Sequence, residues 1–201
     1  MSAKQLYLAS SNPGKLREFA EIGQGEPAAI ALALLPGFAA LPAYPEDAPT
    51  FAENAVGKAL HASGATEEAV LADDSGLVVP SLGGAPGVLS ARYAGAGATG
   101  AQNIAKLLDA LKGKSGGERR AYFVCALAVA RRGKALAVVT NRVDGEILEA
   151  ARGAGGFGYD PVFYFPPLQK SFAEITASEK NTNSHRGKAF RRLLAVLPSM
   201  L

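Results

Sequence analysis

The chain has 201 residues, which is enough to bury a sizeable core, and we expect a single domain over residues 1–201. Hydrophobic residues make up 48% and charged residues 19% of the sequence, a composition too apolar for intrinsic disorder. The longest apolar stretch, residues 28–35, is too short to span a bilayer, and the first residues lack the apolar core of a signal peptide. We therefore expect a cytoplasmic protein that has no contact with a membrane.

A net charge of +3 and an isoelectric point of about 9.0 raise the question of nucleic-acid binding. Residues 170–201 contain six basic and two acidic residues, so that this segment carries +4 and the remainder carries −1. A local basic patch that faces a small polyanion explains this distribution as well as a nucleic-acid surface does, and it needs fewer lysines. We expect a small-molecule partner and no nucleic acid.

The first predicted elements are a buried strand at residues 5–9 and a helix with apolar residues at helical spacing after residue 15. The loop between them consists of Ser10, Ser11, Asn12, Pro13, Gly14 and Lys15. Such a loop suits a phosphate group, because free backbone amides and the helix dipole face the anion and the lysine adds a full charge. It is not a Walker A sequence, and a turn that caps the helix explains it equally well.

Two adjacent aspartates follow the next helix, which a Thr50–Glu53 capping box opens and which is predicted to run to about residue 65. A strand at residues 69–72 is expected to present Asp73 and Asp74 at its end. In an extended chain these two carboxylates point in opposite directions. One of them can bind magnesium and accept a proton from an attacking water. A simple turn is the alternative, but the apolar strand before the pair favours a site.

A second capping box, Thr99 to Gln102, opens an amphipathic helix. Two extended runs follow, residues 120–130 and 135–143, joined by a turn at residues 131–134 that predicts a hairpin. The single cysteine, Cys125, lies in the first run, where we expect a small buried hydrophobe. The elements predict an α/β protein with a long mixed or antiparallel sheet, and the hairpin disfavours a regular doubly wound fold.

The last two motifs are a glycine-rich loop at residues 153–158, before a strand at residues 161–165, and a basic segment at residues 179–188. Glycines around Phe157 let the backbone approach a flat ligand, and the aromatic ring offers a stacking face, although a tight loop with core aromatics is an equal alternative. Ser184 is predicted to cap the final helix. Lys180, His185 and Arg186 near its start suit phosphate and carbonyl oxygens, and an arginine donor distinguishes a 6-keto purine from a 6-amino purine.

Together, these segments resemble the inosine triphosphate pyrophosphatase family, also called the Ham1-like or dITP/XTP pyrophosphatases. The matching motifs lie in the family's order and cover nearly the whole chain: residues 11–18, 50–59, 72–77, 90–93, 156–161 and 179–188. The resemblance implies an elongated α/β fold of two lobes around a long central mixed sheet with flanking helices, and a nucleotide cleft between the lobes. It also implies a homodimer that uses Mg²⁺ to hydrolyse ITP, dITP or XTP to the monophosphate and pyrophosphate, which removes deaminated purines from the nucleotide pool.

The same resemblance assigns roles to individual residues. Asp74 is implied as the proton acceptor and a Mg²⁺ ligand. The triphosphate is implied to contact Ser10, Ser11, Asn12, Pro13, Gly14, Lys15 and Lys58. The remaining substrate contacts are Ser75, Phe157, Gly158, Tyr159, Asp160, Lys180, His185 and Arg186. The family's second acidic ligand has no unique match, because the gap allows Ala43, Pro45 or Glu46; we favour Glu46, with Glu53 as the alternative.

Two rival functions share some of these features. A Maf-like enzyme that acts on pyrimidine or other nucleotides would also use a serine-rich loop and acidic metal ligands. A non-enzymatic binder of nucleotides or nucleic acid would use the basic C-terminal helix, but it would leave the two aspartates without a role. The basic segment after the glycine-rich loop favours a purine triphosphate over both.

Overall fold

The structure is a computed structural model that describes residues 4–11, 13–23 and 30–200. Its seven-stranded sheet has the strand order β2-β1-β3-β4-β5-β6-β7. β1 is parallel to β2 and β3, and all the other pairs are antiparallel, so the sheet is mixed as predicted. The strands are β1 Lys4–Leu8, β2 Ile30–Leu34, β3 Ala69–Val78, β4 Arg120–Arg131, β5 Lys134–Ile147, β6 Phe163–Phe165 and β7 Lys170–Ser171. The helices are α1 Pro13–Gly23, α2 Phe51–Ser63, α3 Gly100–Ala110, α4 Ala177–Asn183 and α5 His185–Val196.

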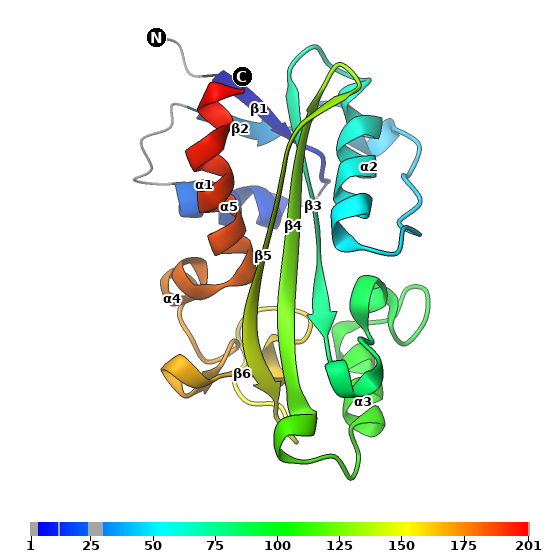
Figure 1. Cartoon of the computed structure of the whole chain (residues 1–201), viewed down its shortest axis with the longest axis vertical. Coiled ribbons are helices and arrows are strands. Elements are labelled where there is room, and N and C mark those ends of the chain that lie inside the picture. Colours follow the sequence, from blue (N-terminus) through cyan, green and yellow to red (C-terminus); the bar gives the residue numbers. More distant parts are fainter. Residues whose placement is uncertain (1–3, 12, 24–29, 201) are drawn as a thin grey trace.

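The long strands β3, β4 and β5 run through most of the length of the molecule (Figure 1). The predicted hairpin of β4 and β5 is confirmed, and its two-residue turn consists of Arg132 and Gly133. Both turn residues have positive φ, 51° and 71°, which is the requirement of a type I′ turn between twisted strands. The hairpin interrupts the alternation of strands and helices, and the fold is therefore not regularly doubly wound.

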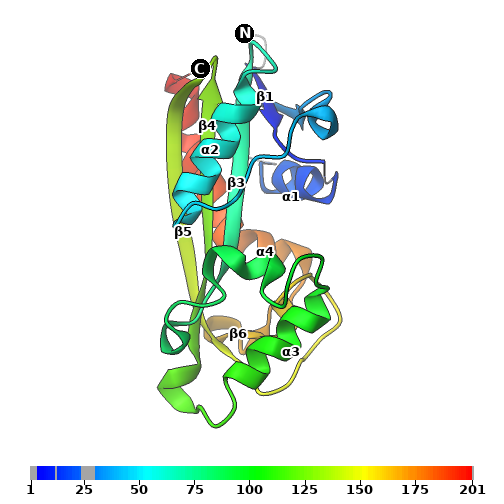
Figure 2. The same cartoon turned by 90° about the vertical axis from the view of Figure 1, so that its right-hand side faces the viewer.

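Helices cover both faces of the upper sheet (Figure 2). Ala126 and Ala128 of β4 pack in a cluster with α2, whereas Leu127 and Val129 pack in a cluster with α1 and α5. This alternation is the two-residue period of a strand that is buried on both sides. Cys125 is fully buried in the cluster on the α5 side, as predicted.

A third core cluster lies at the other end of the long strands, where α3, β6 and the loops around them pack. Its centre is aromatic: the Phe123 and Phe163 rings are 4.6 Å apart, and the Phe163 and Phe172 rings are 4.9 Å apart. The candidate functional site lies between this cluster and the two clusters that pack against α2 and against α1 and α5. The division into two lobes stays a prediction.

Several local predictions are confirmed, one is confirmed only in part and one is wrong. Thr99 forms a complete capping box with Gln102, and the Ser184 hydroxyl accepts a hydrogen bond from the Gly187 amide. At α2 the box is incomplete, because Glu53 accepts from the Thr50 hydroxyl at 2.7 Å. Asp73 and Asp74 do not end a strand: they lie within β3, because each pairs with a residue of β4.

Among the residues that the structure describes, no helix has the length and apolar character that crossing a membrane requires.

Candidate active site

The candidate site lies at an edge of β3 that no other strand covers. β1 pairs with β3 only as far as Leu71, and the Leu77 amide donates to the Ser90 hydroxyl at 2.9 Å. Between these points, in the described part of the chain, residues 73–76 have β4 as their only strand neighbour. The carboxyl ends of the parallel strands β1 and β2 point toward this gap, which is where α/β sheets bind ligands. Side chains from both faces of the sheet can therefore meet at one edge.

On the face toward α1 and α5, Asp73 is the centre of a chain of charges. Lys15 Nζ lies 2.8 Å from Asp73 Oδ1, and Arg186 Nη2 lies 3.7 Å from Asp73 Oδ2. Arg186 also donates to both carboxylate oxygens of Glu18, at 3.0 and 3.1 Å. Burial opposes the ionisation of Asp73, but Lys15 and Arg186 outweigh it and hold the pKa of this carboxyl well below its usual range. Asp73 is therefore an ionised carboxylate that links α1, through Lys15, to α5, through Arg186.

On the opposite face, Asp74 is paired with Lys58 of α2. Lys58 Nζ lies 3.2 Å from Asp74 Oδ1 and 3.1 Å from Glu46 Oε1, so one ammonium group bridges two carboxylates. Burial raises the pKa of Asp74, and the nearby Glu46 charge acts in the same direction while Lys58 opposes it. A carboxylate with a raised pKa is a better proton acceptor than an ordinary aspartate.

The carboxylates of Asp74 and Glu46 fit a hard divalent cation. Asp74 Oδ2 is buried and has no hydrogen-bond partner among the described residues, which makes it a candidate ligand oxygen. Glu53, the alternative second ligand, is exposed and accepts from the Thr50 hydroxyl, so the geometry favours Glu46. No group of three or more histidine, cysteine or acidic side chains suited to a metal occurs in the described segments. Two carboxylates with phosphate oxygens and water are a sufficient set for Mg²⁺.

Beside these charges is a cavity of about 280 Å³. Its walls include Ser75, Gly76, Ser90, Asn103, Phe123, Phe157, Gly158, Tyr159, Asp160, Lys180, His185 and Arg186. The His185 ring stacks on Phe123 with 4.8 Å between the centroids and 13° between the planes. Burial, together with Arg186 and Lys180, lowers the pKa of His185 well below its usual value, so the imidazole is neutral. Its buried Nδ1 has no hydrogen-bond partner within the described segments, so it is a candidate contact for a ligand.

Phe157 stands at the mouth of this cavity with 59% of its surface exposed. Lys180 Nζ lies 4.4 Å and Arg186 Cζ 5.6 Å from its ring centroid, which are cation–π distances. Below the ring, the Asp160 carboxylate pairs with Lys180 and accepts from the Phe157 amide at 2.8 Å. A Cβ on Gly156 would lie 2.2 Å from Asp160 Oδ2, so this turn requires glycine. Asp160 thus holds the loop, and its expected contact with a base or ribose stays a prediction.

The structure brings most of the remaining predicted residues to the same place. Ser10 is buried after β1, Ser11 is exposed, and Gly14 and Lys15 lie in the first turn of α1, which begins at Pro13. Asn12 lies outside the described residues. The Tyr159 hydroxyl donates to the Ser90 carbonyl at 2.9 Å and so joins the glycine-rich loop to the cavity wall.

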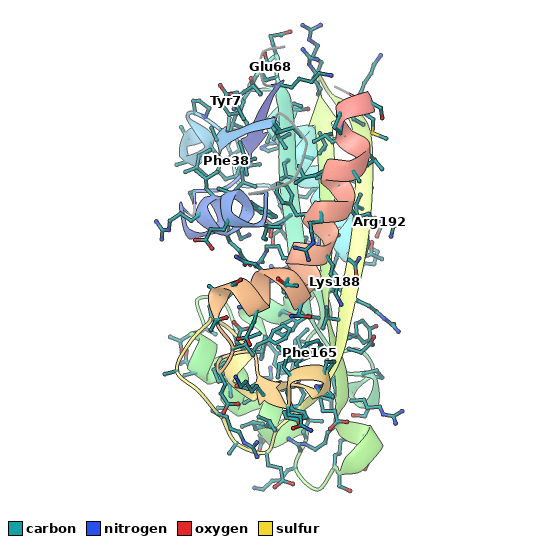
Figure 3. The ribbon with its side chains drawn as sticks, turned by 90° about the vertical axis from the view of Figure 1, so that its left-hand side faces the viewer. Tyr7, Phe38, Glu68, Phe165, Lys188 and Arg192 are labelled. Carbon is teal, nitrogen blue, oxygen red and sulfur yellow. The ribbon has the colours of Figure 1, made fainter. Side chains whose placement is uncertain are left out.

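The basic C-terminal residues do not form one continuous patch. Lys180 and Arg186 turn into the site, whereas Lys188 and Arg192 are exposed along α5 (Figure 3). Arg191 donates to the carbonyls of Asn181 and Thr182 at 3.0 and 2.6 Å. This division fits a small anion at the site better than a nucleic-acid surface along the helix.

Glu18, Asn54 and Arg92 are parts of the site to which sequence reasoning gave no role. Glu18 lies one helical turn after Lys15, and that spacing is the only local signal that both side chains face the same way. Asn54 and Arg92 lie inside the matched motifs, but their partners at Ala48 and Glu46 are in an irregular loop.

The mixed sheet, the charged edge and the adjoining cavity with its aromatic walls define an α/β protein of the nucleotide-binding class. Comparison with known proteins makes this specific: the chain belongs to the Ham1 family, whose profile matches residues 6–196. It is 51% identical to the dITP/XTP pyrophosphatase of Geobacillus kaustophilus, over 94% of this chain and 92% of that protein. The dITP/XTP pyrophosphatase of Bacillus subtilis is 43% identical, over 96% and 97% of the two chains.

Solved structures show the same fold. A HAM1 protein from Coxiella burnetii superposes with a TM-score of 0.87 at 40% identity, over 98% of this chain and 99% of its own. A nucleoside-triphosphatase / dITP/XTP pyrophosphatase from Mycobacterium abscessus superposes with a TM-score of 0.74 at 38% identity, over 96% and 99%. The predicted α/β class and the family resemblance are therefore confirmed.

Proposed function

We propose that this protein hydrolyses non-standard purine nucleoside triphosphates (ITP, dITP and XTP) to the monophosphate and pyrophosphate, with Mg²⁺ as the cofactor. The observation that carries the proposal is the buried Asp74 carboxylate, which pairs with Lys58, has one oxygen without a hydrogen-bond partner among the described residues, and directly precedes Ser75 and Gly76 in the wall of a cavity that suits a purine base. The name of these relatives, dITP/XTP pyrophosphatase, supports dITP and XTP as substrates and pyrophosphate as a product.

Each part of the site has a task in this reaction. Lys15 and Lys58 neutralise the negative charge of the triphosphate on the two sides of the β3 edge. Asp74 and Glu46 would hold Mg²⁺, which draws charge from the phosphoryl oxygens when it is bound. Asp74, whose pKa is raised, accepts a proton from the water that attacks the α-phosphorus, and pyrophosphate leaves.

Recognition of the base follows from the donors in the cavity. Phe157 offers its face to a purine, and the Lys180 and Arg186 side chains lie close to the ring. His185 and the Nε of Arg186, which has no partner among the described residues, match the O6 of hypoxanthine or xanthine as donors, whereas the 6-amino group of adenine leaves them unpaired. A buried unmatched donor costs about 1–3 kcal/mol, which is enough for useful discrimination against ATP.

The proposal also includes three features from the resemblance and the sequence: one domain over residues 1–201, assembly as a homodimer, and action in the cytoplasm. Size-exclusion chromatography with light scattering tests the dimer directly. A monomer at micromolar concentration would remove the homodimer from the proposal without affecting the reaction.

The reaction is tested by measuring pyrophosphate release from dITP, ITP, XTP, GTP, ATP and dTTP, with Mg²⁺ and with EDTA. We expect Mg²⁺-dependent release from the first three, far above that from GTP and ATP. Release of orthophosphate, or a preference for dTTP, would contradict the proposal in favour of another nucleotide hydrolase. Absence of turnover together with steeply salt-dependent RNA or DNA binding would favour a non-enzymatic binder.

A further inference from the structure

Glu46 lies in a segment that has no regular structure of its own. Residues 42–49 belong to no helix or strand, and three of them are prolines, which lack an amide donor. The position of the Glu46 carboxylate therefore depends on groups outside the loop. Most of these groups belong to one helix.

That helix is α2, and its contacts with the loop follow a helical stripe. Asn54, Gly57, Lys58 and His61 are spaced i, i+3, i+4 and i+7, which places them on one face. The buried Asn54 side chain accepts from the Ala48 amide at 3.0 Å and lies 3.5 Å from the Ala48 carbonyl. One helical turn further, Lys58 contacts Glu46 at 3.1 Å, and His61 Nε2 lies 2.8 Å from the Pro42 carbonyl. The loop is thus held at both ends and in the middle.

Gly57 explains how the loop comes so close to α2. The Tyr44 ring of the loop lies against the bare backbone at this position, where a Cβ would be 1.9 Å from Tyr44 Oη and 2.2 Å from Cζ. Glycine inside a helix is less favourable than alanine, so its presence in the middle of α2 requires a packing reason. The close approach of Tyr44 supplies that reason.

Arg92 holds the loop from the other side. It lies in the 3-10 helix Gly87–Arg92 and donates from Nη2 to the Glu46 carbonyl. Its Nη1 lies 3.9 Å from the Glu46 carboxylate. The backbone and the side chain of the same residue are therefore both held, as a metal ligand on an irregular loop requires.

We propose that Asn54, Gly57, His61 and Arg92 are positioning residues that keep Glu46 within reach of the cation site at Asp74. This inference rests on the proposed function, in which the two carboxylates are the protein's Mg²⁺ ligands. Moving the loop away from α2 would weaken cation binding, while Lys15 and the base cavity stay in place because they belong to other elements.

The test is the variant Gly57→Ala, whose new methyl group displaces Tyr44. Its matched control is Gly64→Ala at the end of the same helix, where a Cβ would meet only the His61 carbonyl at an ordinary 3.6 Å. The dissociation constant for Mn²⁺, measured without substrate from the electron paramagnetic resonance signal of the free ion, reports on the cation site in the absence of turnover. The Mg²⁺ concentration that gives half-maximal pyrophosphate release reports on the affinity of the same site during turnover.

We expect both cation constants of Gly57→Ala to weaken by about tenfold or more, and those of Gly64→Ala to stay unchanged. At saturating Mg²⁺, the KM for dITP of Gly57→Ala should stay close to that of the unmodified protein. General damage to the fold would instead lower turnover at every Mg²⁺ concentration without moving the cation constants, and this result would overturn the inference. Wild-type cation constants in a folded Gly57→Ala protein would overturn it as well.

Two further variants keep the outcomes separate. If Gly57→Ala does not fold, His61→Ala removes the contact with Pro42 at an exposed position, and unchanged cation binding in that variant counts against the inference. Glu46→Gln tests the ligand itself. Weak cation binding in Glu46→Gln with normal binding in Gly57→Ala would refute only the positioning role, whereas normal binding in Glu46→Gln would refute the ligand assignment of the proposed function.

Discussion

The two adjacent aspartates should respond in opposite ways to the same substitution. Asp74→Asn keeps the shape of the side chain but removes the proton acceptor and a cation ligand. Loss of these roles predicts a fall in turnover of roughly a thousandfold. Stability should not fall, because burial already disfavours the charged form of Asp74, as its raised pKa shows, and because Lys58 keeps Glu46 as a partner.

Asp73→Asn should instead act on stability. Asp73 is buried between Lys15 and Arg186, and its removal leaves Arg186, a fully buried cation, with Glu18 alone. Breaking a buried ion pair costs about 3–5 kcal/mol, and we take about 3 kcal/mol because Glu18 remains. For a chain of this length, that loss lowers the melting temperature by about 6–12 °C.

The assays are pyrophosphate release from dITP at saturating Mg²⁺ and thermal unfolding followed by circular dichroism, applied to both variants and to the unmodified protein. We expect Asp74→Asn to lose turnover at an unchanged or raised melting temperature, and Asp73→Asn to melt earlier while it keeps more turnover than Asp74→Asn. Near-normal turnover in folded Asp74→Asn would refute its role as proton acceptor. A melting temperature of Asp73→Asn equal to that of the unmodified protein would refute the stabilising role of the buried Asp73 carboxylate.

Three other predictions concern the pH dependence of stability, the exposed ring of Phe157 and the packing of the core. The pKa of Asp73 is lower in the folded than in the unfolded protein, so the stabilisation that this carboxylate gives is complete above the unfolded pKa and is lost as the pH falls below about 4. Lowering the pH should therefore narrow the difference in the free energy of unfolding between Asp73→Asn and the unmodified protein. Phe157→Ala should raise the KM for dITP about tenfold by loss of base stacking, with an unchanged melting temperature because the ring is exposed; an unchanged KM would contradict the stacking role. Phe190→Ala, which removes a ring packed 4.7 Å from Phe19, should destabilise the protein by about 3–5 kcal/mol in urea unfolding, and a loss below 1 kcal/mol would mean that the core closes around the gap.

Local signals were sufficient to predict much of the fold. The capping box of α3, the Ser184 cap of α5 and the turn before β5 depend on residues close together in the chain, and the structure contains all three. α4 was not predicted, because its seven residues include no buried side chain and only one apolar residue, Ala177; the local signal that it does carry is the capping box of Thr176 and Glu179. β2 lies in a short run of alanine and leucine that does not distinguish a strand from a helix.

The site was predictable as a set of residues but not as a set of contacts. Arg186 and its partner Glu18 are separated by 168 positions, so no local pattern predicts their ion pair. For the same reason the expectation that Arg186 donates to a ligand did not include Glu18 and Asp73, which engage both of its terminal nitrogens. The continuation of β3 through the aspartates was missed because pairing with β4 overrides the low strand propensity of aspartate.

The register between β3 and β4 determines which aspartate has which role. Nine consecutive pairs, Val70 to Val78 with Ala130 to Tyr122, place Asp73 toward α1 and Asp74 toward α2. A slip of one residue would exchange the two carboxylates between the faces, and the proton acceptor would then lie among the cations of α1 and α5 with a depressed pKa. Gly76 opposes such a slip, since a Cβ at its position would lie 2.4 Å from Ser90 Oγ and any other residue placed there would collide. Adjacent aspartates in a fixed register thus provide one structural tie and one reactive carboxylate at the same uncovered edge.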